Sequence, residues 1–467
     1  MAGALDPFVP SSSDPWDARK AAHLLRRAGF GPLPDEIARA VAAGPDRTVE
    51  SLFAFPPEPD EPAVFVDVRA AEAQLQTAIA ALRAAREQIS LQTHPELRAL
   101  FQETRRQHAR ALVTVAAWWM NRMAASPAPL QEKLTLFWHG HFTSAFGDVH
   151  DAIAMFNQNQ LYRRHAAGNF ATLLDGVARD PAMLRYLNND ANRKGHPNEN
   201  WARELMELFT MGIGHYAETD VKESARAWTG WTLRDYRTGE GRRSFEFKPA
   251  IHDDGPKMFL GQAGPWDGTD IMRIILAEDA TPRFVAGKLA AFFVAPDPDP
   301  ALVDAMARQL RAANYELVPV LRSLFGSRAF YRPAAMLAQV KGPVEFAIGA
   351  VRHLGINDPN WDRVYQAAGA MGQRLFFPPT VAGWHGGPAW INAGTIFART
   401  DLAAALVSDR LGAVDPGAFP TLDATIDRLL GRPLAPHRHV VLAAAAAGRA
   451  SREALHLVMS LPEYLVA

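Results

Sequence analysis

Hydrophobic positions recur with the helical period along most of the chain. In the stretch "DPWDARKAAHLLRRAGFG", Ala21, Leu24, Leu25 and Ala28 share one face, and the pattern stops at Gly29. A glycine directly after the last apolar position is a common helix end. The pattern therefore predicts an amphipathic helix close to the N-terminus.

Two long helices are predicted over 68–90 and 95–125, and we expect them to form a projecting helical hairpin. Shorter periodic segments follow them along the chain. They predict helices over 129–138, 148–166, 170–178, 181–188, 198–211, 219–230, 269–277, 281–293, 299–313, 316–326, 334–353 and 359–371.

Alternation of apolar and polar residues replaces the helical period near 243–261, where Asp254-Gly255 is the expected hairpin turn. The fold class is therefore mainly α, as one compact multi-helical body with a small β-hairpin insert and a projecting helical hairpin. The expected segments are N-terminal helices with a Pro-rich linker (1–60), the long hairpin (61–128), and a helical core (129–467) that holds the insert and a Gly/Pro/Trp loop at 376–395.

Composition narrows the classes of protein. The 49 Lys and Arg nearly balance the 50 Asp and Glu, which argues against nucleic acid as a partner. The absence of cysteine excludes thiolate sites, so a metal would need His, Asp, Glu or main-chain oxygen. The N-terminus shows no secretion signal and the longest apolar runs are short, so we expect a cytoplasmic protein without a membrane span.

Familiar catalytic motifs are missing. The chain has no G-x-S-x-G elbow, no phosphate-binding G-x-x-x-x-G-K-[ST], no H-E-x-x-H and no dinucleotide glycine fingerprint. Any site must therefore be sought in other residue patterns.

The segment "NENWARELMELFTMG" places carboxylates on an otherwise apolar helix. Glu204 and Glu207 share one stripe, and Glu199 lies in the first turn. Buried carboxylates are costly unless they are paired, hydrogen-bonded or bound to a cation. Two interpretations stay open: these groups line a metal or catalytic site, or they form ion pairs with Arg203 and other basic residues.

Two more segments carry candidate groups. "LFWHGHFTS" holds His139 and His141, which cannot share a helical face, and we favour His141 because it follows a glycine where the chain turns. A hydrogen-bonded core histidine is the alternative. In "IHDDGPK", turn geometry explains Asp254 but not His252, Asp253 or Lys257.

Loops supply the remaining candidates. The segment 376–400 contains paired prolines and several glycines, and it is either a packed surface loop or an aromatic wall formed by Trp384, His385 and Trp390. An amide-rich segment provides either turns or ligands for a hard cation, at Asn188, Asn189, Asp190 and Asn192.

The sequence resembles the bacterial family called domain of unknown function 1800 (DUF 1800). The matching text is "AAHLLRRAGFGPLPDEI", "FWHGHFTS", "DPAMLRYLNN", "NENWARELMELFTMGIGHYAETDVKESARAWTGW", "HDDGPKMFLG", "FPPTVAGWHGGPAWIN" and "LHLVMSLPEYL". The resemblance implies one architecture over nearly the whole chain, export in many members and a sulfatase-like partner protein. The family's recurring text includes His141, Glu199, Glu204, Glu207, His252, Asp253 and Trp384.

We therefore expect an enzyme site between the 198–211 helix, the 139–141 segment, the β insert and the 376–395 loop. A divalent metal would be held by His141, Glu204, Glu207 and His252. The catalytic set would be Glu199, Glu204, Asp253 and His252, and a small polar substrate would contact Arg203, Lys257, Trp384, His385 and Trp390.

Hydrolysis of a polar organic or saccharide-like substrate is slightly favoured, because no redox cofactor motif is present. A non-haem metal oxidoreductase is the first alternative, since such a site needs just His and carboxylates. The second is a non-catalytic binding or scaffold protein in which the buried carboxylates form structural ion pairs.

Overall fold

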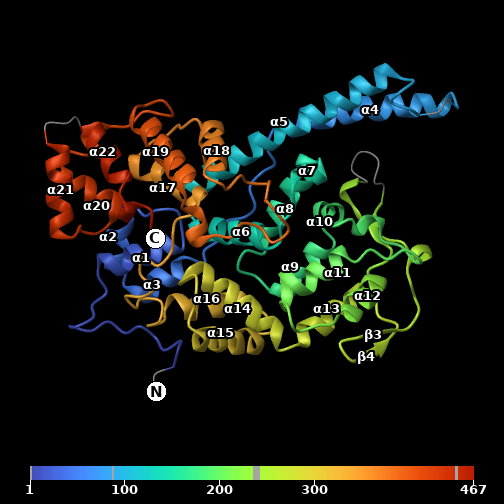
Figure 1. Ribbon diagram of the computed structural model, residues 1–467, viewed down its shortest axis with the longest axis horizontal. Coiled ribbons are helices and arrows are strands. Elements are labelled where there is room, and N and C mark those ends of the chain that lie inside the picture. Colours follow the sequence, from blue (N-terminus) through green and yellow to red (C-terminus); the bar gives the residue numbers. More distant parts are fainter. Residues whose placement is uncertain (1–2, 87–88, 235–241, 448–450) are drawn as a thin grey trace.

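Helices form most of the structure, a computed structural model that describes residues 3–86, 89–234, 242–447 and 451–467 (Figure 1). The mainly α fold expected from the sequence is confirmed. The N-terminal helices are α1 (Ala18–Arg27), α2 (Pro34–Ala43) and α3 (Pro45–Ser51). No helix in the described ranges is both long enough and apolar enough to cross a membrane.

The projecting hairpin consists of α4 (Phe65–Ala84) and α5 (Pro95–Ala125), which reach beyond the rest of the molecule at the upper right of Figure 1. Pro95 begins α5 at a position where its missing N–H is not needed. The buried residues of α5 concentrate toward its C-terminal half, for example Val115, Trp119 and Met120. One end of the hairpin is therefore anchored in the core.

Central helices follow the hairpin. They are α6 (Pro129–His141), α7 (Phe146–Val149), α8 (Ala152–Arg164), α9 (Phe170–Ala178), α10 (Pro181–Tyr186), η1 (Asn189–Ala191), α11 (Asn200–Glu204), the π-helical turn η2 (Leu205–Thr210) and α12 (Glu218–Ala227). The chain then continues, after the β insert, through α13 (Gly268–Ala277), α14 (Ala280–Phe293), α15 (Pro300–Ala312) and α16 (Leu317–Phe325).

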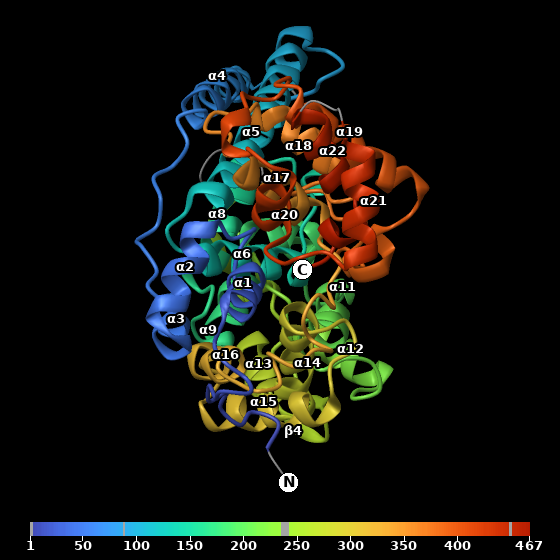
Figure 2. The same ribbon diagram turned by 90° about the vertical axis from the view of Figure 1, so that its left-hand side faces the viewer.

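The C-terminal part returns over the other side of the body. Its elements are α17 (Pro343–Leu354), α18 (Trp361–Ala370), η5 (Gly387–Trp390), α19 (Ala393–Val407), η6 (Pro416–Ala418), α20 (Leu422–Leu430), α21 (Pro436–Ala446), α22 (Ser451–Met459) and η7 (Pro462–Tyr464). In Figures 1 and 2, α1 lies between the C-terminal helices above it and the α14–α16 group below it.

The β insert is present, but its turn differs from the expected one. Strand β1 (Trp231–Leu233) pairs with β2 (Phe245–Phe247), and β3 (Lys257–Phe259) pairs with β4 (Gln262–Gly264), both antiparallel, with η4 (Pro249–Ile251) between the two pairs. The tight turn joins β3 and β4 at Leu260 and Gly261, which have φ of 45° and 76°. Positive φ at both positions suits a two-residue hairpin. Asp254-Gly255 instead precedes β3.

Two clusters of buried apolar side chains form the core, and α6 contributes to both. Leu134 and Trp138 belong to the cluster that includes α9 and α13–α16, whereas Leu136 belongs to the cluster that includes α5 and α17–α22. A helix that is buried all round is expected at the centre of a large body. The polar side chains of α6 must therefore find partners inside the protein.

A buried charge network fastens the hairpin to the body. Asp151 accepts the N–H groups of Ile153 and Ala154 at the start of α8 and pairs with Arg243 at 3.0 Å. Arg243 also pairs with Glu72 of α4. His108 of α5 lies 3.0 Å from the same Glu72 carboxylate. Four separate segments are thus joined through groups that water cannot reach.

Asp151→Asn should lower the free energy of unfolding by about 3–5 kcal/mol at pH 7, because Arg243 would lose a buried partner. Burial alone would raise the pKa of Asp151, but Arg243, Arg242 and His108 outweigh it and lower the pKa to about 2. A depressed pKa stabilises the fold above about pH 4, and this stabilisation is lost as the pH falls toward 2.

The measurement is chemical unfolding of wild type and Asp151→Asn at pH 7 and pH 3. The gap between the two proteins should narrow at pH 3, and the exposed Asp148→Asn should match wild type at both pH values. A gap of equal size at the two pH values would contradict this account of the network.

Candidate functional site

A cavity of about 390 Å³ lies between α1, α6, α14, α17 and the 376–395 loop. Phe137, from one core cluster, and Leu136, from the other, both line it. The cavity therefore lies where the two halves of the core meet, which is a common place for small-molecule sites.

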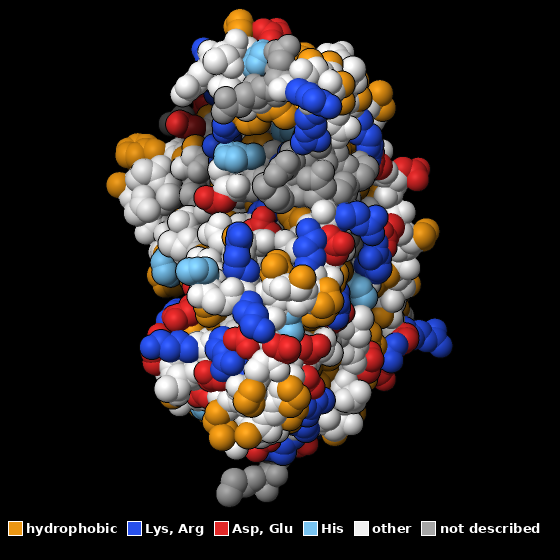
Figure 3. Space-filling model, turned by 90° about the vertical axis from the view of Figure 1, so that its right-hand side faces the viewer, with side chains coloured by type: hydrophobic (Ala, Val, Ile, Leu, Met, Phe, Trp, Pro, Cys, Tyr) orange, Lys and Arg blue, Asp and Glu red, His pale blue; other side chains and the backbone are white. Residues whose placement is uncertain are grey.

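Cationic side chains dominate the charged lining of the cavity. Among the described residues that line it, four are Lys or Arg and one is Glu: Arg26 and Arg27 of α1, Lys133 of α6, Lys288 of α14 and Glu345 of α17. The outer face in Figure 3, by contrast, intersperses basic and acidic side chains. The positive charge is thus a local property of the cavity.

Arg27 and Lys133 are the most deeply buried of these cations, each at 3% exposure, and within the described ranges Arg27 is the one without a carboxylate partner. Its Nη2 donates to the carbonyls of Val294, at 3.1 Å, and Ala335, at 2.9 Å. Its Nε finds no hydrogen-bond partner among the described residues. Burial lowers the pKa of Arg27 to about 9, so the guanidinium is still charged at pH 7.

Among the described residues, the one acidic side chain that lines the cavity is already engaged. Glu345 forms an ion pair with Lys133, whose Nζ also donates to the Gly29 carbonyl at 3.0 Å. Glu345 accepts the Gly342 N–H as well, at 2.7 Å. In the part of the chain that the structure describes, no carboxylate forms an ion pair with Arg26, Arg27 or Lys288. Lys288 is exposed and Arg26 is partly buried, so the cost of an unpaired buried charge falls on Arg27.

Aromatic rings supply much of the apolar lining. The 376–395 loop brings Trp384 and Trp390 to the cavity, where Phe137 and Phe292 pack against each other at 5.1 Å. Gly383 holds the loop in place: its φ is +77°, and a Cβ there would lie 2.4 Å from the Gly140 carbonyl oxygen of α6. The loop is the expected aromatic wall.

The two histidines of α6 have different surroundings. His139 is enclosed by Trp119 and Phe376, and its Nε2 accepts the Phe376 N–H at 3.1 Å. His141 lines the cavity, and its Nε2 donates to the Phe209 carbonyl at 3.0 Å. Burial, followed by Lys288, lowers the pKa of His141 to about 3, so its ring is neutral and Nδ1 keeps a free lone pair.

The carboxylate helix is not a regular α-helix, which changes the faces expected from the sequence. After Glu204 the chain forms the π-helical turn η2. Met211, which follows this turn, is buried. Burial and the neighbouring Glu207 raise the pKa of Glu204. Glu207 accepts a hydrogen bond from Tyr216 at 3.0 Å. Leu208 lines the cavity, whereas neither carboxylate is among its lining residues.

Glu199 and Arg203 form an ion pair, as one of the two interpretations of this segment predicted. Arg203 pairs with Glu199 at 3.1 Å and with Glu218 at 2.6 Å. All three side chains are at least one-third exposed. Neither Glu199 nor Arg203 is among the residues that line the cavity.

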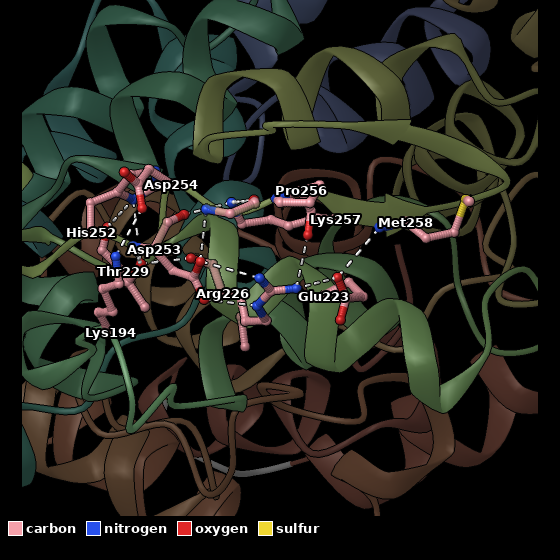
Figure 4. A network of polar contacts seen from close by, with 12 residues as sticks. Lys194, Glu223, Arg226, Thr229, His252, Asp253, Asp254, Pro256, Lys257 and Met258 are labelled. Carbon is pink, nitrogen blue, oxygen red and sulfur yellow. Dashed lines mark hydrogen bonds and ion pairs between the residues drawn. The ribbon is translucent and has the colours of Figure 1, made fainter.

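The β insert forms a polar network of its own (Figure 4). Asp253 pairs with Arg226 of α12 at 2.8 Å, and the Thr229 carbonyl lies 2.8 Å from Nδ1 of His252. Lys257 donates to the carbonyls of Asp253, at 2.6 Å, and Gly255, at 2.9 Å. No residue of the described insert lines the cavity, so the expected convergence of His252 and Asp253 with His141 is not seen.

Potential metal ligands are dispersed. Across the described ranges, no group of three or more His, Asp or Glu side chains is placed to hold a metal ion. His141, Glu204, Glu207 and His252 therefore do not form one ligand set here. The amide-rich segment forms a turn, in which Asn192 accepts the Asn198 N–H and donates to the Ala225 carbonyl.

Three of the five expected substrate contacts line the cavity: Trp384, His385 and Trp390. The cations of the cavity were not predicted from the sequence, although "EKLTLFW" places Lys133 on an apolar helix, whereas Arg26 and Arg27 lie on a helix rich in basic residues. A charge within an apolar helix is the signal that could have identified Lys133.

Fold and cavity together define a mainly α-helical protein with an internal, cationic, indole-walled pocket. The chain belongs to the family described as protein of unknown function DUF1800, whose model matches residues 23–466. The resemblance inferred from the sequence is thereby confirmed. No curated protein and no solved structure matches the chain.

Glu204→Gln tests whether the Glu204–Glu207 pair is strained or holds a cation. Because folding raises the pKa of Glu204, its carboxyl favours the fold below about pH 4.3 and, once ionised at pH 7, opposes folding. The variant should therefore melt about 1–2 °C higher than wild type at pH 7, with no difference at pH 4.

Thermal melts with and without a chelator make the comparison, with the exposed Asp401→Asn as control. A lower melting temperature for Glu204→Gln, together with a chelator-sensitive wild type, would contradict strain and support a bound divalent metal.

Proposed function

We propose that the protein binds a small organic anion in the cationic cavity. The observation that carries this proposal is Arg27, a buried guanidinium that lacks a carboxylate hydrogen-bond partner and faces a space lined by Arg26 and Lys288. Buried charges are stable when they are paired. Glu345 attracts Arg27 through space but is bonded to Lys133, so a bound anion would supply the hydrogen-bonded counter-charge that Arg27 lacks.

The cavity also suits the remainder of such a ligand. Guanidinium groups bind planar oxyanions through paired N–H donors, and these bonds are strong where water is excluded. Trp384, Trp390, Phe137 and Phe292 offer apolar surface for a carbon framework. The ligand would therefore combine one anionic group with an apolar or ring-shaped part.

A hydrolytic step on the bound anion is the reaction we favour, in line with the expectation from the sequence. His141 supports it, because a neutral imidazole whose Nε2–H is fixed by the Phe209 carbonyl leaves Nδ1 to accept a proton from water. A bound anion would counter the effect of Lys288 and raise the basicity of His141.

Other expectations stay predictions. A divalent metal and a sulfatase-like partner protein have no contact in the structure from which to argue them further. An oxidoreductase or a non-catalytic binding protein remains the alternative to a hydrolase, and anion binding is compatible with each.

Arg27→Gln should weaken anion binding by at least tenfold, because a charge-assisted bond to a buried site is worth about 1.5–3 kcal/mol. Benzoate is a suitable probe, measured by isothermal titration calorimetry. Arg19→Gln, an exposed change on the same helix, should leave the affinity unchanged. The proposal fails if wild type binds no benzoate, or if Arg27→Gln binds it as tightly as wild type does.

His141→Gln should keep benzoate affinity within about twofold, but it should lower the turnover of any hydrolysed ester by about 100-fold or more. The assay uses 4-nitrophenyl acetate, phosphate and sulfate. Absence of turnover by wild type on all three esters, with benzoate still bound, would count against the hydrolase and leave a binding protein.

A further inference from the structure

We infer that the ligand of the cationic cavity is an acidic sugar or a close relative, an anion carried on a hydroxylated, saturated ring. This inference rests on the proposed function and deepens it. It follows from the neutral hydrogen-bonding groups of the cavity, because a ligand that only paired with the cations would leave these groups without partners.

Two of these groups are acceptors without a partner among the described residues. Nδ1 of His141 is one, because Nε2 makes the bond to Phe209. Oε1 of Gln339 is the other, because Nε2 of this side chain donates to the Ala291 carbonyl. Water in the cavity can donate to both.

An anionic group cannot replace that water, since an ionised oxyanion accepts hydrogen bonds and donates none. A ligand that displaces the water must bring O–H or N–H donors, or it leaves buried acceptors unsatisfied at about 1–3 kcal/mol each. The four lining cations disfavour an ammonium group. Hydroxyl groups are therefore the donors that fit.

Free donors lie in the same cavity. Gln373 accepts the Val344 N–H through Oε1, which leaves Nε2 to donate. The indole N–H groups of Trp384 and Trp390 also make no hydrogen bond within the described part of the chain. Hydroxyl groups both donate and accept, so a polyhydroxylated ligand can satisfy both sets.

The aromatic wall indicates the shape of the ligand. The electron-rich faces of indole and phenyl rings attract the C–H groups of a saturated ring. A volume of about 390 Å³ is near the lower end of the range for ligand pockets, which limits the occupant to one or two rings. A monosaccharide with one acidic substituent meets these requirements.

The test is calorimetric titration of the full chain with glucuronate, glucose and cyclohexanecarboxylate. Glucuronate should bind at least tenfold more tightly than either of the others, since glucose lacks the charge and cyclohexanecarboxylate lacks the hydroxyl groups.

The outcomes separate the two proposals. If cyclohexanecarboxylate or benzoate binds as tightly as glucuronate, the sugar inference is overturned and the anion site stands. If glucose equals glucuronate, or if no anion binds, the anion site itself is overturned. Tighter binding of 4-hydroxybenzoate than of glucuronate would replace the saturated ring by an aromatic one and overturn the inference. Titration with glucose 6-phosphate and glucose 6-sulfate then shows which acidic group the cavity prefers. The group carried by the tightest binder of these two and glucuronate is the one assigned.

Gln339→Met provides a readout that general loss of structure would not mimic. It should lower glucuronate affinity about tenfold while leaving cyclohexanecarboxylate affinity unchanged, because one acceptor for a hydroxyl group is removed. Gln102→Met, on the exposed surface of α5, is the matched control. An equal loss for both ligands would overturn the assignment of Gln339 to a hydroxyl group.

Discussion

Compensation of buried charge on α6 is the constraint on which the rest of the architecture depends. This helix is enclosed by both halves of the core, yet it carries Glu132 and Lys133. Glu132 is fully buried and receives two hydrogen bonds of 2.9 Å from Arg163, which is also fully buried. Lys133 pairs with Glu345 of α17. Each ion pair fixes the position of a neighbouring helix, because a misplaced partner would leave an isolated charge in a medium of low dielectric constant.

The same constraint gives the cavity its character. α1 inserts Arg26 and Arg27 beside Lys133, but among the described residues Glu345 supplies the one acidic side chain of the lining. A well-packed core that retains such an imbalance gives up stability, and natural proteins keep that kind of cost mainly where function needs it. Indole rings and neutral amide side chains line the same cavity as the cations. A ligand there would therefore be selected both by its charge and by the shape of its ring.

Much of the architecture could be predicted from the sequence because helical periodicity is local. The long hairpin and the boundaries of α5 follow directly from it. The turn at Leu260-Gly261 was missed because Asp254-Gly255 is the stronger local signal, and its Asp253 neighbour is instead held by Arg226 from another element. Contacts of that kind depend on tertiary structure, which a single sequence does not display.

Of the predicted site, the favoured α6 histidine and part of the 376–395 loop line the cavity, whereas the carboxylates of 198–211 and the β insert do not. Trp384 and Trp390 were identified because aromatic residues in a glycine-rich loop stand out. His252 was included because nothing local explained it, and its partner, Thr229, lies on a different segment. Arg26 and Arg27 were not predicted as site residues, since helical periodicity does not reveal which polar side chains another element will cover.

The π-helical turn η2 gives this protein an unusual sensitivity to chain length. Its wider winding accommodates one residue more than an α-helical turn would, and the Phe209 carbonyl then meets His141. Loss of a single codon in this turn would restore ordinary α-helical winding, which needs one residue fewer, so the flanking residues would keep their places but the Phe209 carbonyl would no longer be displaced toward His141. The imidazole would lose the acceptor that sets its tautomer, so members of this lineage that retain the histidine should rarely tolerate such deletions.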